Sequence, residues 1–302
     1  MRISGLSINL KSFNIIHNTS SRYDNLLTQM VSGKKIQKGS EDPILAQKSI
    51  YLSNLMGENE QYLKNANDAK SLIDYSESIL GQGSNMLTRV KELAIQASSD
   101  TINNESREAI VKEMDQIILE IVNMGNQQYN GKYIFGGTNT IFTGTNANTK
   151  PFELIGNPAT GVKYNGNNED ILFNISNGFQ MASNIPGDEV FLQTIEDLIK
   201  VRNDIQAGNI NDITNVGFDL IEDGIDRFIN ARTELGAKSN VTDATISRIT
   251  AMDTELESSY SSLLGANIVE KQIEVASLEV SYQASLSVVG KLHSMSILNY
   301  IK

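Results

Sequence analysis

The sequence predicts a mainly α-helical protein with a small β insertion. The expected architecture is a long antiparallel helical rod, or coiled coil, built from both termini. Apolar residues recur every seven positions over long segments near both ends of the chain. Proline occurs only four times in 302 residues, so few points interrupt a helix. A segment rich in Gly, Asn and Thr, at 130–187, separates the two helical halves.

The first predicted helix covers residues 5–31 and carries a thin apolar stripe. Steps of three and four residues alternate strictly along this stripe, which is typical of a helix that packs along one partner helix. A helix lying on an ordinary globular core is the alternative, but a broad core requires a wider apolar face. The stripe positions are Leu6, Asn9, Phe13, Ile16, Ser20, Tyr23, Leu27 and Met30.

A hinge is predicted after this helix, because Gly33 and Gly39 flank a basic cluster. The next helix is expected to begin at Pro43, since proline suits the first helical turn. Either Asp42 or Ser40 can cap this helix through its side-chain oxygen.

The helix from Pro43 is expected to run to about Ser98, a length of roughly 80 Å at 1.5 Å per residue. A turn near 98–104 then leads to a third helix over about 105–128, antiparallel to the second. The second helix has these residues at seven-residue spacing: Leu52, Asn59, Ala66, Ile73, Leu80, Leu87 and Ala94.

The middle of the chain predicts a small β domain inserted into the rod. Turn signals such as Asn165-Gly166 and Asn177-Gly178 separate short β-type runs. Helix is expected to resume near Gly187 or Asp188. The expected strands are Lys132–Phe135, Thr140–Thr143, Phe152–Ile155, Val162–Tyr164 and Ile171–Ile175.

The closing segment carries the longest seven-residue repeat. Its phase breaks near Gly265, which predicts a second hinge beside the first and a final helix that pairs with residues 5–31. Before the break the repeat comprises Ile221, Phe228, Leu235, Thr242, Ile249, Leu256 and Leu263. After the break the apolar positions are Ile268, Val275, Leu278, Tyr282, Val289 and Leu292.

The order of these segments predicts three structural parts. Residues 1–40 and 265–302 form terminal coiled-coil arms. Residues 41–130 and 188–264 form a long helical rod domain. Residues 131–187 form a β-rich insertion.

Composition excludes several functional classes. A net charge of −11 without a basic stripe argues against nucleic acid as the main partner. No cysteine is present, so disulfides and thiolate sites are excluded. No apolar window is long enough for membrane insertion. The N-terminus lacks the apolar core of a secretory signal, so the protein is expected in the cytosol unless it leaves by a route without signal cleavage.

Charge is distributed unevenly. Residues 1–40 carry six basic side chains and one acidic side chain, while the middle of the chain is acidic. A solvated acidic midsection explains this pattern. Alternatively, the termini stay neutral or basic so that they pack together or against other subunits.

No catalytic, cofactor or metal site is predicted. His17 and His293 lie near opposite termini without neighbouring acids, so they fit the edge of a stripe better than a ligand set. The segment 165–170 resembles a fragment of a calcium loop, but it lacks the required spacing and fits a turn better. An enzyme with a site hidden in the β insertion remains an alternative.

Five stretches, spread over both ends and the middle of the chain, form a recognisable series. They are Met1-Arg-Ile-Ser4; Val31-Ser-Gly-Lys-Lys-Ile36 followed by Ser40-Glu-Asp-Pro43; Gly131-Lys-Tyr-Ile-Phe-Gly-Gly137; Tyr282-Gln-Ala-Ser-Leu286; and Ser296-Ile-Leu-Asn-Tyr-Ile301. Taken together, they resemble the hook–filament junction proteins of the flagellin superfamily. Glu41 is a departure, because the family usually has Asp at this position.

The resemblance implies a flagellin-like fold and a structural adaptor that is not an enzyme. Terminal helices would form the inner layer of a ring of identical subunits, and the insertion would face outward. Its partners would be a neighbouring hook-associated protein, flagellin, a cytosolic export chaperone and the flagellar type III export apparatus. The protein would be secreted to the flagellum, where it supports motility, without a cleaved signal peptide.

The assembly interface is then expected on the terminal arms, which are predicted to be poorly ordered in the monomer and to fold on assembly. Flagellin itself is an alternative, as is a coiled-coil type III secreted effector or needle component. The expected interface residues are Leu6, Phe13, Ile16, Tyr23, Leu27, Met30, Ile268, Val275, Leu278, Tyr282, Val289 and Leu292. The expected hinge and cap residues are Gly33, Gly39, Asp42, Pro43 and Gly265.

Overall fold

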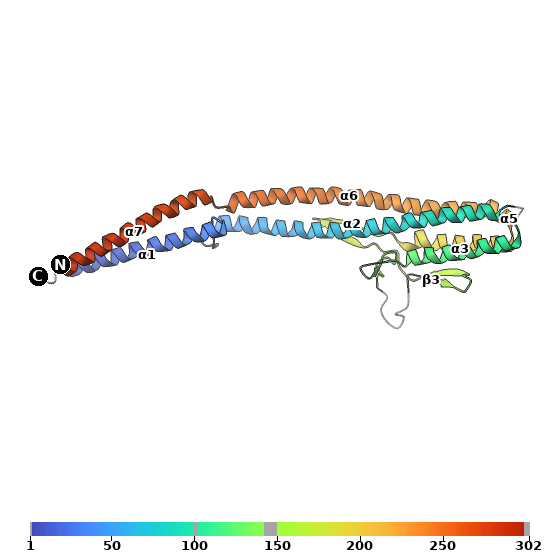
Figure 1. Ribbon diagram of the computed structural model, residues 1–302, viewed down its shortest axis with the longest axis horizontal. Coiled ribbons are helices and arrows are strands. Elements are labelled where there is room, and N and C mark those ends of the chain that lie inside the picture. The colour runs from blue at the N-terminus through green and yellow to red at the C-terminus, as the bar shows by residue number, and fades with distance from the viewer. Residues whose placement is uncertain (1, 100–101, 142–149, 299–302) are drawn as a thin grey trace. The chain divides into compact units, whose positions relative to one another are not determined.

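The computed structural model describes residues 2–99, 102–141 and 150–298 and is mainly helical (Figure 1). Its residues form two compact units, which are described separately below. The arm unit comprises residues 1–58 and 252–302, and the body unit comprises residues 59–251. The units are defined by contacts between residues and do not test the predicted division into terminal arms, rod domain and β insertion. That division stays a prediction.

Long helices dominate the structure, which confirms the predicted fold class. The helix starting at Pro43 and the π-helical turn starting at Asp188 begin where the sequence predicted. The helices are α1 (Arg2–Ser32), α2 (Pro43–Ala97), α3 (Asn104–Gly125), α4 (Gln193–Ala207), α5 (Ile210–Asp212), α6 (Phe218–Leu264) and α7 (Ile268–Leu298), with π-helical turns η1 (Asp188–Leu192) and η2 (Ile213–Gly217).

The β insertion consists of short antiparallel hairpins among the described residues. The pairs are β1 (Gln128–Tyr129) with β2 (Lys132–Tyr133), β3 (Phe152–Ile155) with β4 (Gly161–Tyr164), and β5 (Leu172–Ser176) with β6 (Phe179–Ala182). Asn130 and Gly131 join the first pair at φ 50° and 75°, the left-handed conformation that two-residue hairpin turns require.

Most predicted strands are confirmed, and β1 and β6 are strands that the sequence did not indicate. The strand predicted at Thr140–Thr143 is wrong for Thr140 and Ile141, which lie outside the strands. Phe142 and Thr143 lie outside the described residues. Thr140 instead accepts a hydrogen bond from the amide of Tyr133 through its carbonyl, at 2.9 Å, and so closes a loop.

Most positions of the seven-residue repeats are buried in the body unit, as predicted, whereas Leu52, Leu256 and Leu263 lie in the arm unit and are half-buried. In α2 every repeat position from Asn59 to Ala94 is buried. In α6 the repeat positions Ile221, Phe228, Leu235, Thr242 and Ile249 are buried. Each helix therefore buries one continuous stripe, and the two stripes belong to the core of the same unit.

A cluster of aromatic rings joins the insertion to the helices. Phe191 lies at its centre, with ring-centroid distances of 4.7 Å to Phe135, 5.7 Å to Phe152 and 5.1 Å to Phe228. All four rings are buried. Because these rings come from the insertion, η1 and α6, the β segment is packed into the body unit.

Glycine permits a close approach between α2 and α6. A Cβ atom at Gly83 would lie 2.3 Å from Cε1 of Phe228. The sequence places this glycine mid-helix, where it costs about 1 kcal/mol relative to alanine. The close packing of the Phe228 ring against the α2 backbone explains why glycine occupies this position.

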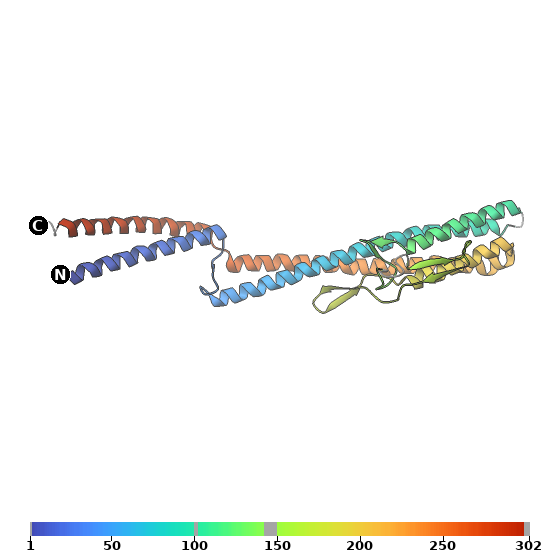
Figure 2. The same cartoon turned by 90° about the horizontal axis from the view of Figure 1, so that it is seen from below.

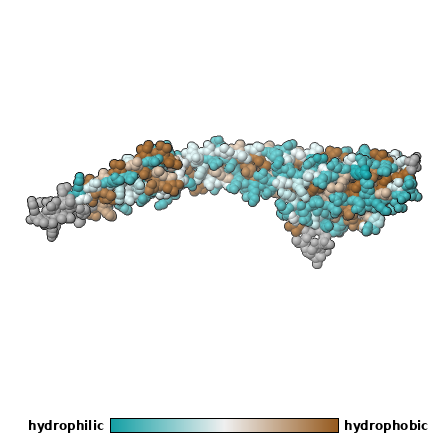
Figure 3. All heavy atoms as spheres, viewed as in Figure 1, coloured by the Kyte–Doolittle hydropathy of each residue, from teal (hydrophilic) through white to brown (hydrophobic). Residues whose placement is uncertain are grey.

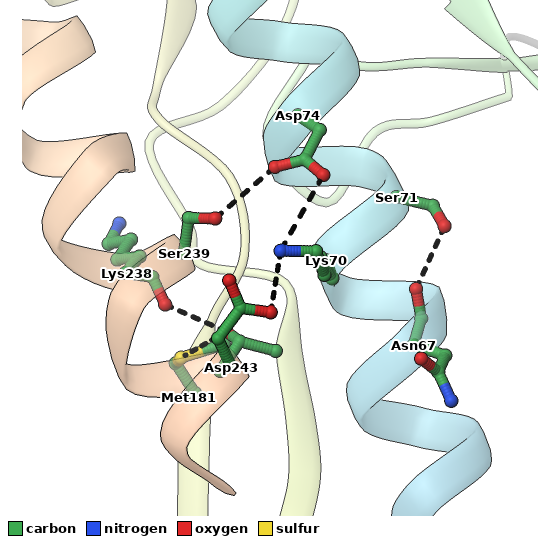
Figure 4. Close-up of polar contacts among 9 residues, drawn as sticks. Asn67, Lys70, Ser71, Asp74, Met181, Lys238, Ser239 and Asp243 are labelled. Carbon is green, nitrogen blue, oxygen red and sulfur yellow. Dashed lines mark hydrogen bonds and ion pairs between the residues drawn. The ribbon is translucent and has the colours of Figure 1, made fainter. Parts of the chain in front are cut away.

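Polar pairs cross between α2 and α6 on the body unit's surface. Figure 4 shows Lys70 of α2 pointing toward Asp243 of α6, with Nζ and Oδ1 separated by 2.6 Å. This hydrogen bond raises the pKa of Lys70 above its usual value. A second pair joins the same two helices, with Nη2 of Arg232 on α6 and Oε1 of Glu77 on α2 lying 2.6 Å apart. Since these side chains are solvent-accessible, the pairs fix antiparallel register more than they add stability.

A buried arginine ties the β3–β4 hairpin to the helices. Arg202 of α4 is only 2% exposed, and its Nε lies 3.3 Å from Oδ1 of Asp115 on α3. Its Nη2 donates to the carbonyl of Ala159, in the turn between β3 and β4. The guanidinium thus serves as a cross-link among three segments.

Candidate assembly interface

The two terminal helices pack side by side in the arm unit, and both chain ends lie at the same end of it (Figures 1 and 2). Their contact line is called the seam. Seven predicted interface residues are half-buried, consistent with a thin stripe shared by two helices. They are Ile16, Tyr23, Met30, Val275, Leu278, Tyr282 and Val289.

The other predicted interface residues do not lie in the seam or are not described. Phe13, Leu27 and Ile268 are exposed, and Leu26 is half-buried where the alternation placed Leu27. The seven-residue spacing of Ile16, Tyr23 and Met30 holds in the structure. Between Tyr23 and Met30 the seam takes the residue three positions after Tyr23 in place of the residue four positions after it. The side chains of Leu6 and Leu292 lie outside the described part of the structure.

A second apolar stripe covers the face of α7 opposite the seam. Val269, Ile273 and Val280 are 67–68% exposed. At 3.6 residues per turn, these positions lie about 180° from Val275, Leu278 and Tyr282 around the helix. A helix that is apolar on opposite faces is typical of one buried from both sides.

Helix α1 also exposes apolar side chains. Leu10, Phe13, Ile15 and Val31 are all solvent-exposed. Figure 3 shows apolar residues gathered along the part of the arm formed by α1 and α7. His17 is exposed as well and stacks on Phe13, with ring centroids 6.3 Å apart, so it extends the aromatic surface.

The two predicted hinges lie side by side within the arm unit. Lys34 and Gly265 form an antiparallel bridge. The amide of Lys35 donates to the carbonyl of Leu264 at 2.7 Å, and the amide of Ala266 donates to the carbonyl of Gly33 at 2.8 Å. The crossing is therefore a small backbone clasp.

Glycine is required at two hinge positions. Gly33 ends α1 at φ 68°, the left-handed conformation in which glycine commonly stops helices. A Cβ atom at Gly265 would lie 2.4 Å from the carbonyl oxygen of Ser261. At Gly39, by contrast, a Cβ would meet only the Cβ of Ala46 at 3.7 Å, so the backbone does not demand glycine there.

At the clasp, hydrogen bonds from side chains satisfy backbone groups at the start of α2 and at the end of α6. Oδ1 of Asp42 accepts hydrogen bonds from the amides of Ile44 and Leu45, at 3.1 and 2.9 Å, which confirms the predicted cap before Pro43. Nζ of Lys35 donates to the carbonyl of Ser262 at 3.1 Å, at the C-terminal end of α6. Sequence reasoning missed this contact, although a basic residue beside a helix C-terminus is electrostatically favourable.

The described residues contain no group of three or more His, Cys, Asp and Glu side chains placed to hold a metal ion. Among the same residues, no helix has the length and apolar character needed to cross a membrane. Burial, followed by the charge of Asp188, raises the pKa of Tyr164 to about 12. Its hydroxyl lies 3.0 Å from the carbonyl oxygens of Phe135 and Asn167, a structural contact.

Family models match both halves of this architecture. The model for the bacterial flagellin N-terminal helical region matches residues 3–140, and the model for the C-terminal helical region matches residues 218–301. Together they cover the arms and most of the long helices. The chain belongs to the bacterial flagellin family.

Relatives within this family carry two kinds of name. Flagellar hook-associated protein 3 of Salmonella typhimurium is 26% identical over 63% of this chain and 57% of that protein. The chain thus spans little more than half the length of this relative. Flagellin of Bacillus subtilis is 25% identical over 96% of both chains. The crystal structure of Bacillus cereus FlgL has a TM-score of 0.58 and 25% identity, covering 70% of this chain and 99% of that one.

Membership of the flagellin family makes the chain a structural component of the bacterial flagellum.

Proposed function

We propose that the protein joins the flagellar hook to the filament as a ring of identical subunits. The name of the Salmonella relative and the fold of FlgL support this role. The observation that carries it is the second apolar stripe of α7, formed by Val269, Ile273 and Val280. In this proposal the stripe is covered by neighbouring subunits.

The free energy available from this stripe is substantial. Burying an exposed valine or isoleucine side chain contributes about 1.5–3 kcal/mol. Each copy presents the same stripe, and a contact between unlike surfaces of identical subunits repeats until it closes a ring or continues as a helix. The stripe therefore favours an oligomer over a monomer.

The arms are proposed to fold fully only on assembly. A seam of seven half-buried residues contributes little against a backbone entropy cost of about 1–2 kcal/mol per ordered residue. Limited trypsin digestion of the monomer should cut first at Lys38 and Lys271, the lysines nearest the two hinges, and should leave residues 39–271. A digest in which both termini survive longer than the β insertion contradicts this part of the proposal.

Assembly through the stripe is tested by placing charge on it. The double variant Ile273→Glu, Val280→Glu should keep its body unit folded, because both side chains lie in the arm unit and are exposed, but it should fail to assemble. The matched control is Ser277→Glu, Ser281→Glu, which adds two acids at exposed polar positions of the same helix. Equal assembly of both variants in sedimentation and motility assays contradicts the role of the stripe.

The remaining partners follow from the same role. The protein is proposed to contact a neighbouring hook-associated protein on one side and flagellin on the other. A cytosolic chaperone would cover the apolar arms before export through the type III apparatus, without signal cleavage. No catalytic step, cofactor or nucleic acid is part of this role.

A filament subunit is the second candidate, favoured by the match that spans 96% of Bacillus subtilis flagellin. Deletion of the gene separates the two roles. Loss of a junction protein should shed assembled filament into the medium and leave hooks behind. Loss of a flagellin should leave no filament protein polymer in either place, which would overturn the junction role.

A further inference from the structure

A cleft of about 550 Å³ lies within the body unit. It is bounded by α2, by the β1–β2 hairpin and by the start of β5. Its volume falls within the range of small-molecule sites in proteins. Neither the proposed ring nor the hinge uses it.

Aromatic rings form much of the cleft wall. Tyr129, Tyr133 and Phe173 line it, and all three are half-buried. Leu172, which is 55% exposed, adds an apolar edge from β5. A flat ring that is half open to solvent offers a face on which the C–H groups of a ligand can stack.

Polar groups of both kinds border the same cleft. Asp68 on α2 and Asp170 before β5 supply carboxylates, and Lys132 on β2 supplies an ammonium group. These three side chains are exposed and make no hydrogen bond or ion pair with the described residues. The hydroxyl of Thr138, in contrast, already donates to Oε2 of Glu169 at 2.8 Å.

This mixture restricts the class of ligand. An anion meets two carboxylates, and a cation would pair with a carboxylate but leave the ammonium group of Lys132 without a partner. A purely apolar ligand would desolvate charged groups without giving them partners. A neutral polyol avoids all three problems, because each hydroxyl both donates to a carboxylate and accepts from an ammonium group.

We propose that the cleft binds a neutral saccharide. A pyranose ring stacks its C–H face on the aromatic wall, and its hydroxyls hydrogen-bond with Asp68, Asp170 and Lys132. This site is independent of the junction role. It holds equally if the protein is a filament subunit.

Saturation-transfer NMR on the full-length protein tests the proposal with four probes: methyl glucoside, methyl galactoside, N-acetylglucosamine and cellobiose. At least one should receive saturation at its ring protons, with a dissociation constant on the order of 1 mM, as expected for a shallow site. Asp170→Asn should weaken that binding about five- to tenfold, because it removes a charge-assisted hydrogen bond.

A ring variant and its control complete the experiment. Phe173→Ala should also weaken binding. Phe179→Ala, on the neighbouring strand β6 outside the cleft and 46% exposed, should bind like the wild type. Because Phe173 also contacts the core, Asp170→Asn is the variant that tests the site without a change in packing.

Three results overturn the proposal. The first is the absence of saturation transfer to all four sugars. The second is binding that Asp170→Asn and Phe173→Ala leave unchanged. The third is uptake of a charged probe, arginine or citrate, in preference to every sugar, which would assign the cleft to an ionic ligand.

Discussion

Replacing Gly83 by alanine should destabilise the protein, although alanine is the better helix former. The propensity gain in a helix interior is about 1 kcal/mol. Against it, the new Cβ would lie 2.3 Å from Cε1 and 2.9 Å from Cδ1 of Phe228. The Phe228 ring is fully buried and packs edge-on against Phe191 at 5.1 Å, so it has little room to move.

Overpacking of a core costs about 1–3 kcal/mol and here should exceed the propensity gain. Because a contact of 2.3 Å with a buried ring belongs to the severe part of that range, about 2–3 kcal/mol, we expect a net loss of about 1–2 kcal/mol in the free energy of unfolding. For a domain of this size that corresponds to a fall in Tm of about 2–8 °C. Denaturant unfolding measures the free energy and thermal unfolding measures Tm, both followed by far-ultraviolet circular dichroism.

Gly81→Ala is a matched control in the same helix. Its Cβ would meet only the guanidinium of Arg232, at 3.6 Å, an ordinary contact. This variant should be about 0.5–1 kcal/mol more stable than the wild type. Adding Phe228→Leu to Gly83→Ala should recover part of the loss by making room. If Gly83→Ala alone proves as stable as Gly81→Ala, the close approach of α2 and α6 is refuted.

Three further predictions concern single side chains. Asp42→Ala should cost about 1 kcal/mol in unfolding free energy, since it removes the cap of α2; an unchanged denaturation midpoint would contradict the cap. Asp115→Asn should cost about 1–3 kcal/mol, because it leaves the Arg202 guanidinium buried without its counter-charge, whereas no loss would show that the guanidinium finds another partner. Raising the pH from about 10 to 12 should progressively destabilise the protein, because Tyr164 ionises in the unfolded chain before it does in the folded one, where its pKa is about 12. Tyr164→Phe should flatten that part of the pH profile of unfolding, and identical slopes for both proteins would exclude the tyrosine as the cause.

The long helices could be predicted from the sequence because their signal is repeated many times. Seven-residue spacing placed Ile73, Leu80 and Leu87 of α2 in the core, and Phe228 and Leu235 of α6 as well. A polar residue at one of these positions would not have hidden the seven-residue repeat of either helix. The hinge crossing was also predictable, since both breaks in the pattern fall at glycines and the helices on each side must pair.

Contacts between distant segments could not be predicted in the same way. Nothing in the sequence around Arg202 indicates that its guanidinium is buried against Ala159, which lies 43 residues away. Short strands such as β1 and β6 depend on their hairpin partners more than on local residue preference. The cleft escaped notice for the same reason, because Asp68 and Asp170 approach it from different elements.

The seam shows where periodicity itself is insufficient. A strict three-four alternation selected Leu27, whereas the structure half-buries Leu26 and exposes Leu27. A step of three residues and a step of four both fit a seven-residue repeat, so contact with the partner helix decides which of two adjacent leucines faces the seam. The apolar stripe opposite the seam was not predicted either, because a seven-residue repeat marks only one face of a helix.

The central claim, a ring of subunits between hook and filament, is tested most directly by electron microscopy of intact flagella carrying a label on this protein. The account predicts a single band of label at the border where the hook meets the filament. Label distributed along the length of the filament would contradict it and identify the protein as a filament subunit.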